Sequence, residues 1–348
     1  MTEAAADRDF CIAMLPQVSR TFAACIGLLP QPLQHRVLVA YLLCRIADTV
    51  EDCARLRCAE KQSLLAGFRS CLDEGATGDA ELDHTFTQPA TADELLTRDA
   101  LRTLREFRAF PADVRRAIRP WVQEMCEGMA WFAGLQPSPG TFQALERTAD
   151  LDRYCWYVAG TVGHLLTELF RIHSPRIDRQ RYDRLKASAG EFGLGLQLVN
   201  IIKDVADDRA RGWSFVPREF CTPSGFQPED LLSEQHQAQA KETMVRMIMK
   251  ARGHLDGALQ YCLELPAYDY RIRLFCLAPL YFAVRTLTLA ANDPRLLDPS
   301  HKVKIRRQHV YQTLAAGYLV APCNQLVRKY YRRLAGIGGG HRSRDTGR

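Results

Sequence analysis

Apolar residues recur at helical spacing along almost the whole of this 348-residue chain, and strand signals are scarce. No Asn-Gly or Asp-Gly turn lies between two alternating segments, so no β-hairpin is indicated. Gly- and Pro-rich stretches over 73–93 and 211–228 read as connections. The sequence therefore predicts an all-α fold. The predicted helical stretches are 37–47, 94–110, 111–133, 141–170, 179–208, 229–263, 270–291 and 303–334.

The length admits two domains of roughly 150 residues or one large helical domain. Apolar residues make up 47% of the chain and charged residues 25%, which is the balance of a globular protein with a sizeable core. We expect one folded domain over residues 1–335. The Gly/Arg-rich stretch 336–348 is expected to be a flexible tail.

The twelve cysteines do not show the spacing of a disulfide framework or a zinc site. Most of them, such as Cys44 and Cys276, stand among apolar residues, so we interpret them as reduced core residues. Residues 1–10 are too charged for a signal peptide. The longest strongly apolar run, 274–284, has 11 residues, whereas a membrane-spanning helix needs about 20. We therefore expect a cytoplasmic protein, at most peripheral at a membrane.

One apolar helical segment ends in three carboxylates. Over residues 37–47 the only charge is Arg45, which predicts a largely buried helix. Asp48, Glu51 and Asp52 follow at spacings i, i+3 and i+4, so they share one face. Clustered carboxylates repel one another and are costly to bury unpaired, so this face needs cations.

A second apolar segment, 192–208, also ends in acids. Gln197, Asn200, Asp204 and Asp208 are spaced by three or four residues and form a polar stripe along it. Oxygen ligands in such a stripe suit Mg²⁺, which takes a few carboxylates and completes its shell with water and substrate phosphates.

A single acidic run of this kind is most often a solvated helix face. Two such runs, each on an otherwise apolar helix, favour a metal and diphosphate site instead. Arg20, Arg45 and Lys203 are nearby cations that can donate to diphosphate oxygens.

Four motifs, in order along the chain, resemble the squalene/phytoene synthase family. They are Ser19–Phe22, Asp48–Asp52, Tyr154–Gly163 and Asn200–Asp208. Three further stretches are similar to the squalene synthase branch of that family. These are Gly128–Ala130, Phe275–Pro279 and Val303–Arg307.

The resemblance implies an all-α isoprenoid synthase fold, terpenoid synthase-like, with one catalytic domain around a central cavity. It implies that two farnesyl diphosphates join head to head to give presqualene diphosphate, which NADPH then reduces to squalene. The implied cofactors are Mg²⁺, which Mn²⁺ can replace, and NADPH.

The resemblance also implies roles for individual residues. The metal ligands would be Asp48, Glu51, Asp52, Asn200, Asp204 and Asp208. The substrate would contact Ser19, Arg20, Phe22, Tyr41, Arg45, Gln197, Asn200, Lys203 and Phe275. Tyr154 would help remove the proton during cyclopropane formation, acting with the aspartates as the catalytic set. Lys304 and Arg306 would bind the NADPH phosphates. Trp156 and Tyr157 either stabilise a carbocation or are plain core residues.

The sequence departs from the family pattern at three positions. Trp213 and Lys203 stand where the family usually has Arg, and Leu280 replaces a frequent Gln. These departures keep an alternative open, namely a synthase that stops at presqualene diphosphate or makes dehydrosqualene or phytoene without NADPH. Arg209 or Arg211 would supply the missing guanidinium.

Two other classes are disfavoured. A catalytically silent helical protein would not be expected to keep five acids at matching positions. The net charge of +6 is diffuse and does not form an aromatic-interleaved basic face, so no nucleic-acid partner is expected. The expected partner is farnesyl diphosphate, and the protein is expected to be a monomer. The basic tail offers peripheral contact to an anionic membrane.

Overall fold

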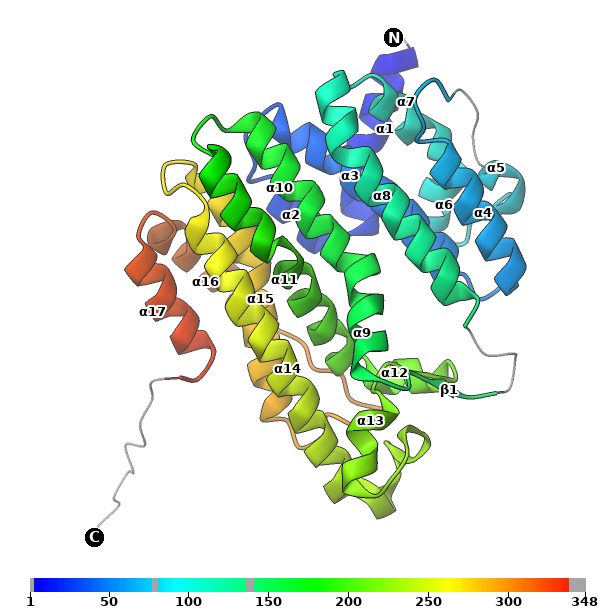
Figure 1. Ribbon diagram of the computed structural model, residues 1–348, viewed down its shortest axis with the longest axis vertical. Coiled ribbons are helices and arrows are strands. Elements are labelled where there is room, and N and C mark those ends of the chain that lie inside the picture. The colour runs from blue at the N-terminus through cyan, green and yellow to red at the C-terminus, as the bar shows by residue number, and fades with distance from the viewer. Residues whose placement is uncertain (1–2, 77–80, 136–140, 338–348) are drawn as a thin grey trace.

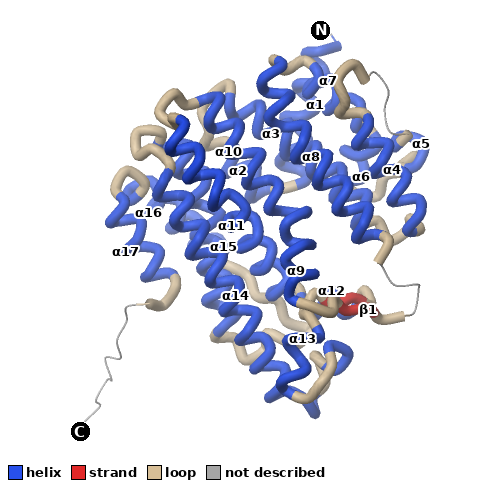
Figure 2. Tube along the Cα trace, viewed as in Figure 1, coloured by secondary structure: helices blue, strands red, loops and turns tan. Residues whose placement is uncertain are grey.

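The computed structural model describes residues 3–76, 81–135 and 141–337. These residues form an all-α fold, as predicted, in which long helices lie roughly side by side (Figures 1 and 2). The two strands described, β1 (Gln143–Ala144) and β2 (Trp213–Ser214), have two residues each and pair in parallel. The predicted tail lies largely outside the described residues, so the division at residue 335 remains a prediction.

The helices of the first half precede β1. They are α1 (Glu3–Val18), α2 (Arg20–Ile26), α3 (Leu33–Asp52), α4 (Cys58–Ser70), α5 (Leu82–Thr85), α6 (Ala92–Arg98), α7 (Ala100–Arg108) and α8 (Ala112–Ala133). The central part contains α9 (Thr148–Cys155), a π-helical turn (Trp156–Gly160), α10 (Thr161–His173), α11 (Arg179–Lys203), α12 (Val205–Ala210) and α13 (Arg218–Cys221). Three 3₁₀ turns follow (Thr222–Ser224, Pro228–Asp230 and Glu234–His236), and then α14 (Gln237–Glu264), α15 (Tyr270–Ala291), α16 (Arg307–Val320) and α17 (Asn324–Leu334).

Each predicted helical stretch is largely helical, but the structure interrupts several of them. Asp99 separates α6 from α7, and Asp204 separates α11 from α12, each with a backbone outside the helical region. Pro322 lies in the turn between α16 and α17, where its missing N–H cannot continue a helix. The stretch 141–170 contains β1 as well as helices, and 229–263 is α-helical only from Gln237. The predicted connection 73–93 contains α5, and the connection 211–228 contains β2 and α13.

Two glycines fix the central helices against one another. A Cβ at Gly193 on α11 would lie 2.0 Å from the carbonyl oxygen of Ala159, and one at Gly163 on α10 would lie 1.9 Å from that of Ala189. Only glycine permits such backbone approach. The Tyr154 motif is therefore held directly against the helix that leads to the second acidic segment.

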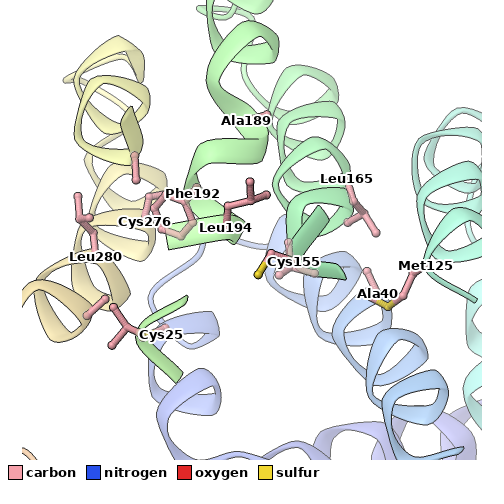
Figure 3. Packing of buried hydrophobic residues seen from close by; sticks show 14 of the residues in the cluster. Cys25, Ala40, Met125, Cys155, Leu165, Ala189, Phe192, Leu194, Cys276 and Leu280 are labelled. Atoms are coloured by element: carbon pink, nitrogen blue, oxygen red, sulfur yellow. The ribbon is translucent and has the colours of Figure 1, made fainter. Parts of the chain in front are cut away.

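The core is apolar and contains most of the cysteines. Figure 3 shows Cys25, Cys155 and Cys276 among apolar side chains from α2, α3, α8, α10, α11 and α15. All twelve cysteines are free and eight are buried, so the interpretation of these eight as reduced core residues is confirmed.

One described helix, α15, is long and apolar enough to cross a membrane by length and composition. The apolar run counted in the sequence is shorter because Arg273 and Arg285 interrupt it. Of its most apolar 18-residue window, 61% is buried inside the protein, as in the core helix of a soluble protein. Leu280, one of the departures from the family pattern, is fully buried on this helix.

Candidate active site

The first acidic segment forms the last turns of α3. Arg45 Nη1 lies 2.5 Å from Asp48 Oδ2, and Arg45 Nε lies 2.7 Å from Oδ1 of Asp93 on α6. The Glu51 side chain is buried, whereas Asp52 at the helix end is exposed. Asp93 is remote in sequence from both acidic motifs and was not among the predicted site residues.

The second acidic segment spans the break between α11 and α12. Asp204 caps the end of α11 and is paired with Lys203. Asp208, one turn further on, is buried and is paired with Arg211. Lys302 Nζ lies 2.7 Å from Asp207 Oδ2, which ties the segment before α16 to this site.

The two acidic segments meet at Arg211. Its Nη1 atom lies 3.9 Å from Asp52 Oδ1, while Nη2 contacts Asp208 Oδ1. One guanidinium thus touches carboxylates from α3 and α12, in opposite halves of the chain. The structure therefore brings together acids that the sequence could only place on separate helices.

Burial and mutual repulsion perturb these carboxyls. Burial raises the pKa of Asp48 to about 6, and the neighbouring Asp52 charge adds to this rise. Burial likewise raises the pKa of Asp208 to about 6, although Arg211 opposes the shift. Both residues are therefore carboxylates held in an unfavourable environment at neutral pH, and additional cations would stabilise them.

The donor set suits Mg²⁺, but internal cations now hold the carboxylates. Among the described residues, no three His, Cys, Asp or Glu side chains are grouped closely enough to hold a metal ion. The hard carboxylate oxygens of the two segments are nevertheless the ligands that Mg²⁺ prefers. Arg211 would have to leave Asp52 and Asp208 before a metal could bind between them.

Tyr154 lies in a cluster of aromatic rings beside the first acidic segment. Its ring centroid is 4.4 Å from Phe132 and 4.5 Å from Phe215. Burial, followed by the charges of Glu51, Asp52 and Asp48, raises the pKa of its hydroxyl well above the usual value. The phenol is therefore neutral and close to these acids. Phe132 and Phe215 were not among the site residues predicted from the sequence.

Trp213 forms part of the same aromatic cluster. It packs edge-on against Phe132 at 4.9 Å and is almost completely buried. The side chain at the position where the family usually has Arg thus contributes an apolar wall. Arg211, two residues earlier, presents the guanidinium to the acids.

Trp156 and Tyr157 are half-buried, and their side chains contact α8. The Trp156 indole N–H donates to Glu124 Oε1 at 2.8 Å. The Tyr157 ring lies so close to Gly128 that a Cβ there would come within 1.9 Å of it. This contact explains the glycine of the Gly128–Ala130 stretch.

Three more of the predicted substrate residues, Ser19, Phe22 and Tyr41, lie together beside the first acidic segment. The Phe22 backbone N–H donates to Ser19 Oγ at 3.2 Å, and Phe22 lies 5.4 Å from Tyr41 by ring centroid. The Tyr41 hydroxyl is hydrogen-bonded to Ser19. Arg20 is exposed.

On α11, Gln197 is half-buried and Asn200 is exposed near the helix end. Phe275 is buried and packs edge-on against Phe170 at 6.0 Å, in the core. Lys304 and Arg306 are exposed on the segment that Lys302 ties to α12.

The helical fold and the two facing acidic segments define a terpenoid synthase-like protein of the all-α class. The sequence model described as squalene/phytoene synthase matches residues 15–309. The chain belongs to the squalene/phytoene synthase family, a family of isoprenoid-synthesising enzymes.

Its relatives include squalene synthases. The chain is 30% identical over 305 residues to the squalene synthase of Schizosaccharomyces pombe, covering 87% of this chain and 64% of that protein. It is 28% identical to that of Cyberlindnera jadinii, covering 93% and 70%. The chain thus spans about two thirds of the length of these relatives.

Solved structures agree with this fold. A structure of TcSQS in complex with the ligand BPH1237 superposes with a TM-score of 0.79 at 27% identity, covering 95% of this chain and 92% of that one. A dehydrosqualene synthase structure, at 20% identity, has a TM-score of 0.64 over 95% of this chain and 98% of that one, and shows the fold alone.

Proposed function

We propose that this protein joins two farnesyl diphosphates head to head to form presqualene diphosphate and then reduces this intermediate to squalene with NADPH. The first step forms a cyclopropane and releases one diphosphate and one proton. The second step releases the other diphosphate and takes up a hydride from NADPH. The squalene synthases among the relatives support this choice of substrate and product.

The observation that carries the proposal is the meeting of the two acidic segments at Arg211. A reaction that expels diphosphate needs positive charge where the anion departs. Two facing sets of carboxylates can hold several divalent cations at one place. Mg²⁺ bound to Asp48, Asp52, Asp204 and Asp208 would neutralise the departing diphosphate.

The cations that now pair with the acids would then bind the diphosphate. Arg45, Lys203 and Arg211 each contact a carboxylate of the site. Once metals take over these carboxylates, the guanidinium and ammonium groups can donate to phosphate oxygens instead. Arg211 would thereby supply the charge that Trp213 lacks.

Tyr154 would act on the carbocation formed after diphosphate departs. Its hydroxyl, next to the first acidic segment, would relay the proton lost as the cyclopropane closes, passing its own proton to a neighbouring carboxylate or to the released diphosphate. The rings of Phe132, Trp213 and Phe215 would exclude water and stabilise the cation without attacking it.

The NADPH step rests on Lys304 and Arg306. Both are exposed, and neither is paired with an acid in the described part of the chain. Lys302, two residues before Lys304, contacts Asp207, so this basic segment runs beside the second acidic segment. Exposed cations next to the site fit the phosphates of a dinucleotide.

A second candidate function is condensation without reduction, ending at presqualene diphosphate or an unreduced hydrocarbon. Trp213 and Leu280, both buried, favour it because they replace polar residues usual in the family.

The condensation itself is tested by diphosphate release from farnesyl diphosphate. Release that needs Mg²⁺, stops with a chelator and returns on adding Mg²⁺ or Mn²⁺ is expected. Release unaffected by the chelator, or absent at all Mg²⁺ concentrations, would remove the metal site and with it the proposed reaction.

A further inference from the structure

We propose that α16, α17 and the basic segment before them form a docking surface for an anionic phospholipid bilayer. The surface comprises the exposed residues of 302–337. It shares Lys302 with the acidic site and Lys304 and Arg306 with the proposed NADPH site, and the proposal does not depend on the reaction catalysed.

Charge is strongly segregated along the chain. Residues 299–348 contain 11 Lys and Arg but only one acidic residue, Asp345, whereas residues 1–298 contain 35 Lys and Arg and 39 acidic residues. The last 50 residues thus carry a net charge of +10 and the remainder −4. The modest overall charge of +6 hides this asymmetry.

The cations of α17 are free of acidic partners among the described residues and gather around one hollow. The hollow is lined mainly by basic side chains and ends at Ile337. Its basic residues are Arg328, Lys329, Arg332 and Arg333. Some exposed arginines elsewhere, such as Arg184 with Glu264 at 2.8 Å, instead form ion pairs. A hollow of unpaired cations is suited to phosphate headgroups.

Apolar side chains are exposed on the same two helices. Tyr311, Ala315 and Tyr318 are spaced i, i+4 and i+7 along α16, so they share one face. Leu319 is 79% exposed, and Leu326 on α17 is 46% exposed. The two helices pack against each other and form one edge of the molecule (Figure 1).

This combination favours a bilayer over other anionic partners. Exposed aliphatic chains gain little from a phosphate backbone, where stacking needs aromatic or guanidinium planes. In a bilayer they enter the interface, where tyrosines also lie, while Lys and Arg bind anionic headgroups. A second copy of this surface would be repelled, since both copies carry the same charge.

The test is sedimentation of the full chain with lipid vesicles, without substrate. Vesicles of phosphatidylcholine mixed with phosphatidylglycerol are compared with pure phosphatidylcholine at several salt concentrations. Binding to the anionic vesicles that weakens with salt is expected.

Matched variants locate the surface. Each removes three Arg and one Lys by substitution with Gln, and all eight residues are exposed without an ion pair in the described chain. The test variant changes Arg328, Lys329, Arg332 and Arg333. The control variant changes Arg8, Arg116, Arg179 and Lys241. The test variant should lose about a hundredfold or more in vesicle affinity, because each of the four cations near an anionic surface contributes about a fivefold factor.

The apolar contribution has its own pair of variants. Leu319→Gln with Leu326→Gln should weaken vesicle binding even at high salt. Val245→Gln with Met249→Gln on α14, also exposed, should leave it unchanged.

The proposal is overturned if the full chain ignores anionic vesicles at low salt. Equal losses in the two charge variants would also overturn it, because they would reflect overall charge alone. So would binding of single-stranded RNA, but not vesicles, through the α17 cations.

Discussion

Arg211 Nη1 lies 3.9 Å from Asp52 Oδ1, so a single side chain joins the end of α3 to the acids of α12. The same guanidinium contacts Asp208. The protein thus neutralises part of its own acidic site with a residue that is 61% exposed and can move. Arg211 is positioned to exchange a carboxylate for a diphosphate when metals bind.

Arg211→Gln should raise the affinity for Mg²⁺ in the absence of diphosphate by about two- to fivefold, since a partly exposed ion pair is worth about 0.5–1 kcal/mol. It should also raise the KM for farnesyl diphosphate. Titration calorimetry with Mg²⁺ measures the first effect. The control is Arg209→Gln, because Arg209 instead donates to the Glu229 carbonyl oxygen at 3.2 Å. Unchanged metal affinity in Arg211→Gln would contradict this role.

Asp48→Asn and Asp204→Asn should each lower the rate of diphosphate release by a thousandfold or more, as about 4 kcal/mol of electrostatic stabilisation is lost. Neither variant should unfold, which thermal melting checks. Asp183→Asn, on the exposed side of α11, is the matched control and should retain full activity. Full activity in Asp48→Asn or Asp204→Asn would remove that residue from the metal site.

Tyr154→Phe should abolish presqualene diphosphate formation, with a loss of about a hundredfold or more, because the ring stays but the hydroxyl that relays the proton is gone. Binding of farnesyl diphosphate should change little. Tyr157→Phe keeps its packing on Gly128 and should behave as the native protein. An unchanged yield in Tyr154→Phe would exclude the hydroxyl from catalysis.

Activity should rise as pH increases through 6, whereas the contribution of Asp208 to the free energy of unfolding should fall over the same range. The pKa values of Asp48 and Asp208 are raised to about 6, so both groups are protonated below pH 6 and hold cations poorly. The value of kcat/KM should therefore fall about tenfold per pH unit or more below pH 6. A higher Mg²⁺ concentration should shift this acidic fall in kcat/KM to lower pH, because the metal competes with the proton for the carboxylates.

The folded protein binds more protons at Asp208 than the unfolded chain between about pH 4 and 6. The contribution of Asp208 to stability is thus most favourable below pH 4 and is lost as pH rises through 6. Asp208→Asn should raise the melting temperature of the chelator-treated protein at pH 7.5 by roughly 1–4 °C, and less at pH 4.5. An equal or larger gain at pH 4.5 would contradict the raised pKa.

The sequence sufficed for the all-α class and for both acidic segments, because helical spacing and charge clusters are local properties. It did not predict the breaks at Asp99 and Asp204, where a single residue leaves the helix. A helix propensity averaged over a long window does not reveal a single non-helical residue.

The aromatic residues around Tyr154 could not be predicted from the sequence either. Phe132 lies on α8, while Trp213 and Phe215 arrive with β2, whose pairing with β1 involves two residues on each side. Such a short non-local contact has no sequence signal. Similarly, the sequence left Arg209 and Arg211 as two candidates for the missing guanidinium. Only the fold shows that Arg211 contacts Asp52, whereas Arg209 donates to the carbonyl oxygen of Glu229.

Product analysis by mass spectrometry tests the central claim most directly. The purified chain is incubated with farnesyl diphosphate and Mg²⁺, with and without NADPH. We expect squalene only when NADPH is present, and presqualene diphosphate to accumulate when it is absent. An unreduced product that is the same with and without NADPH would contradict the reductive step and the roles of Lys304 and Arg306.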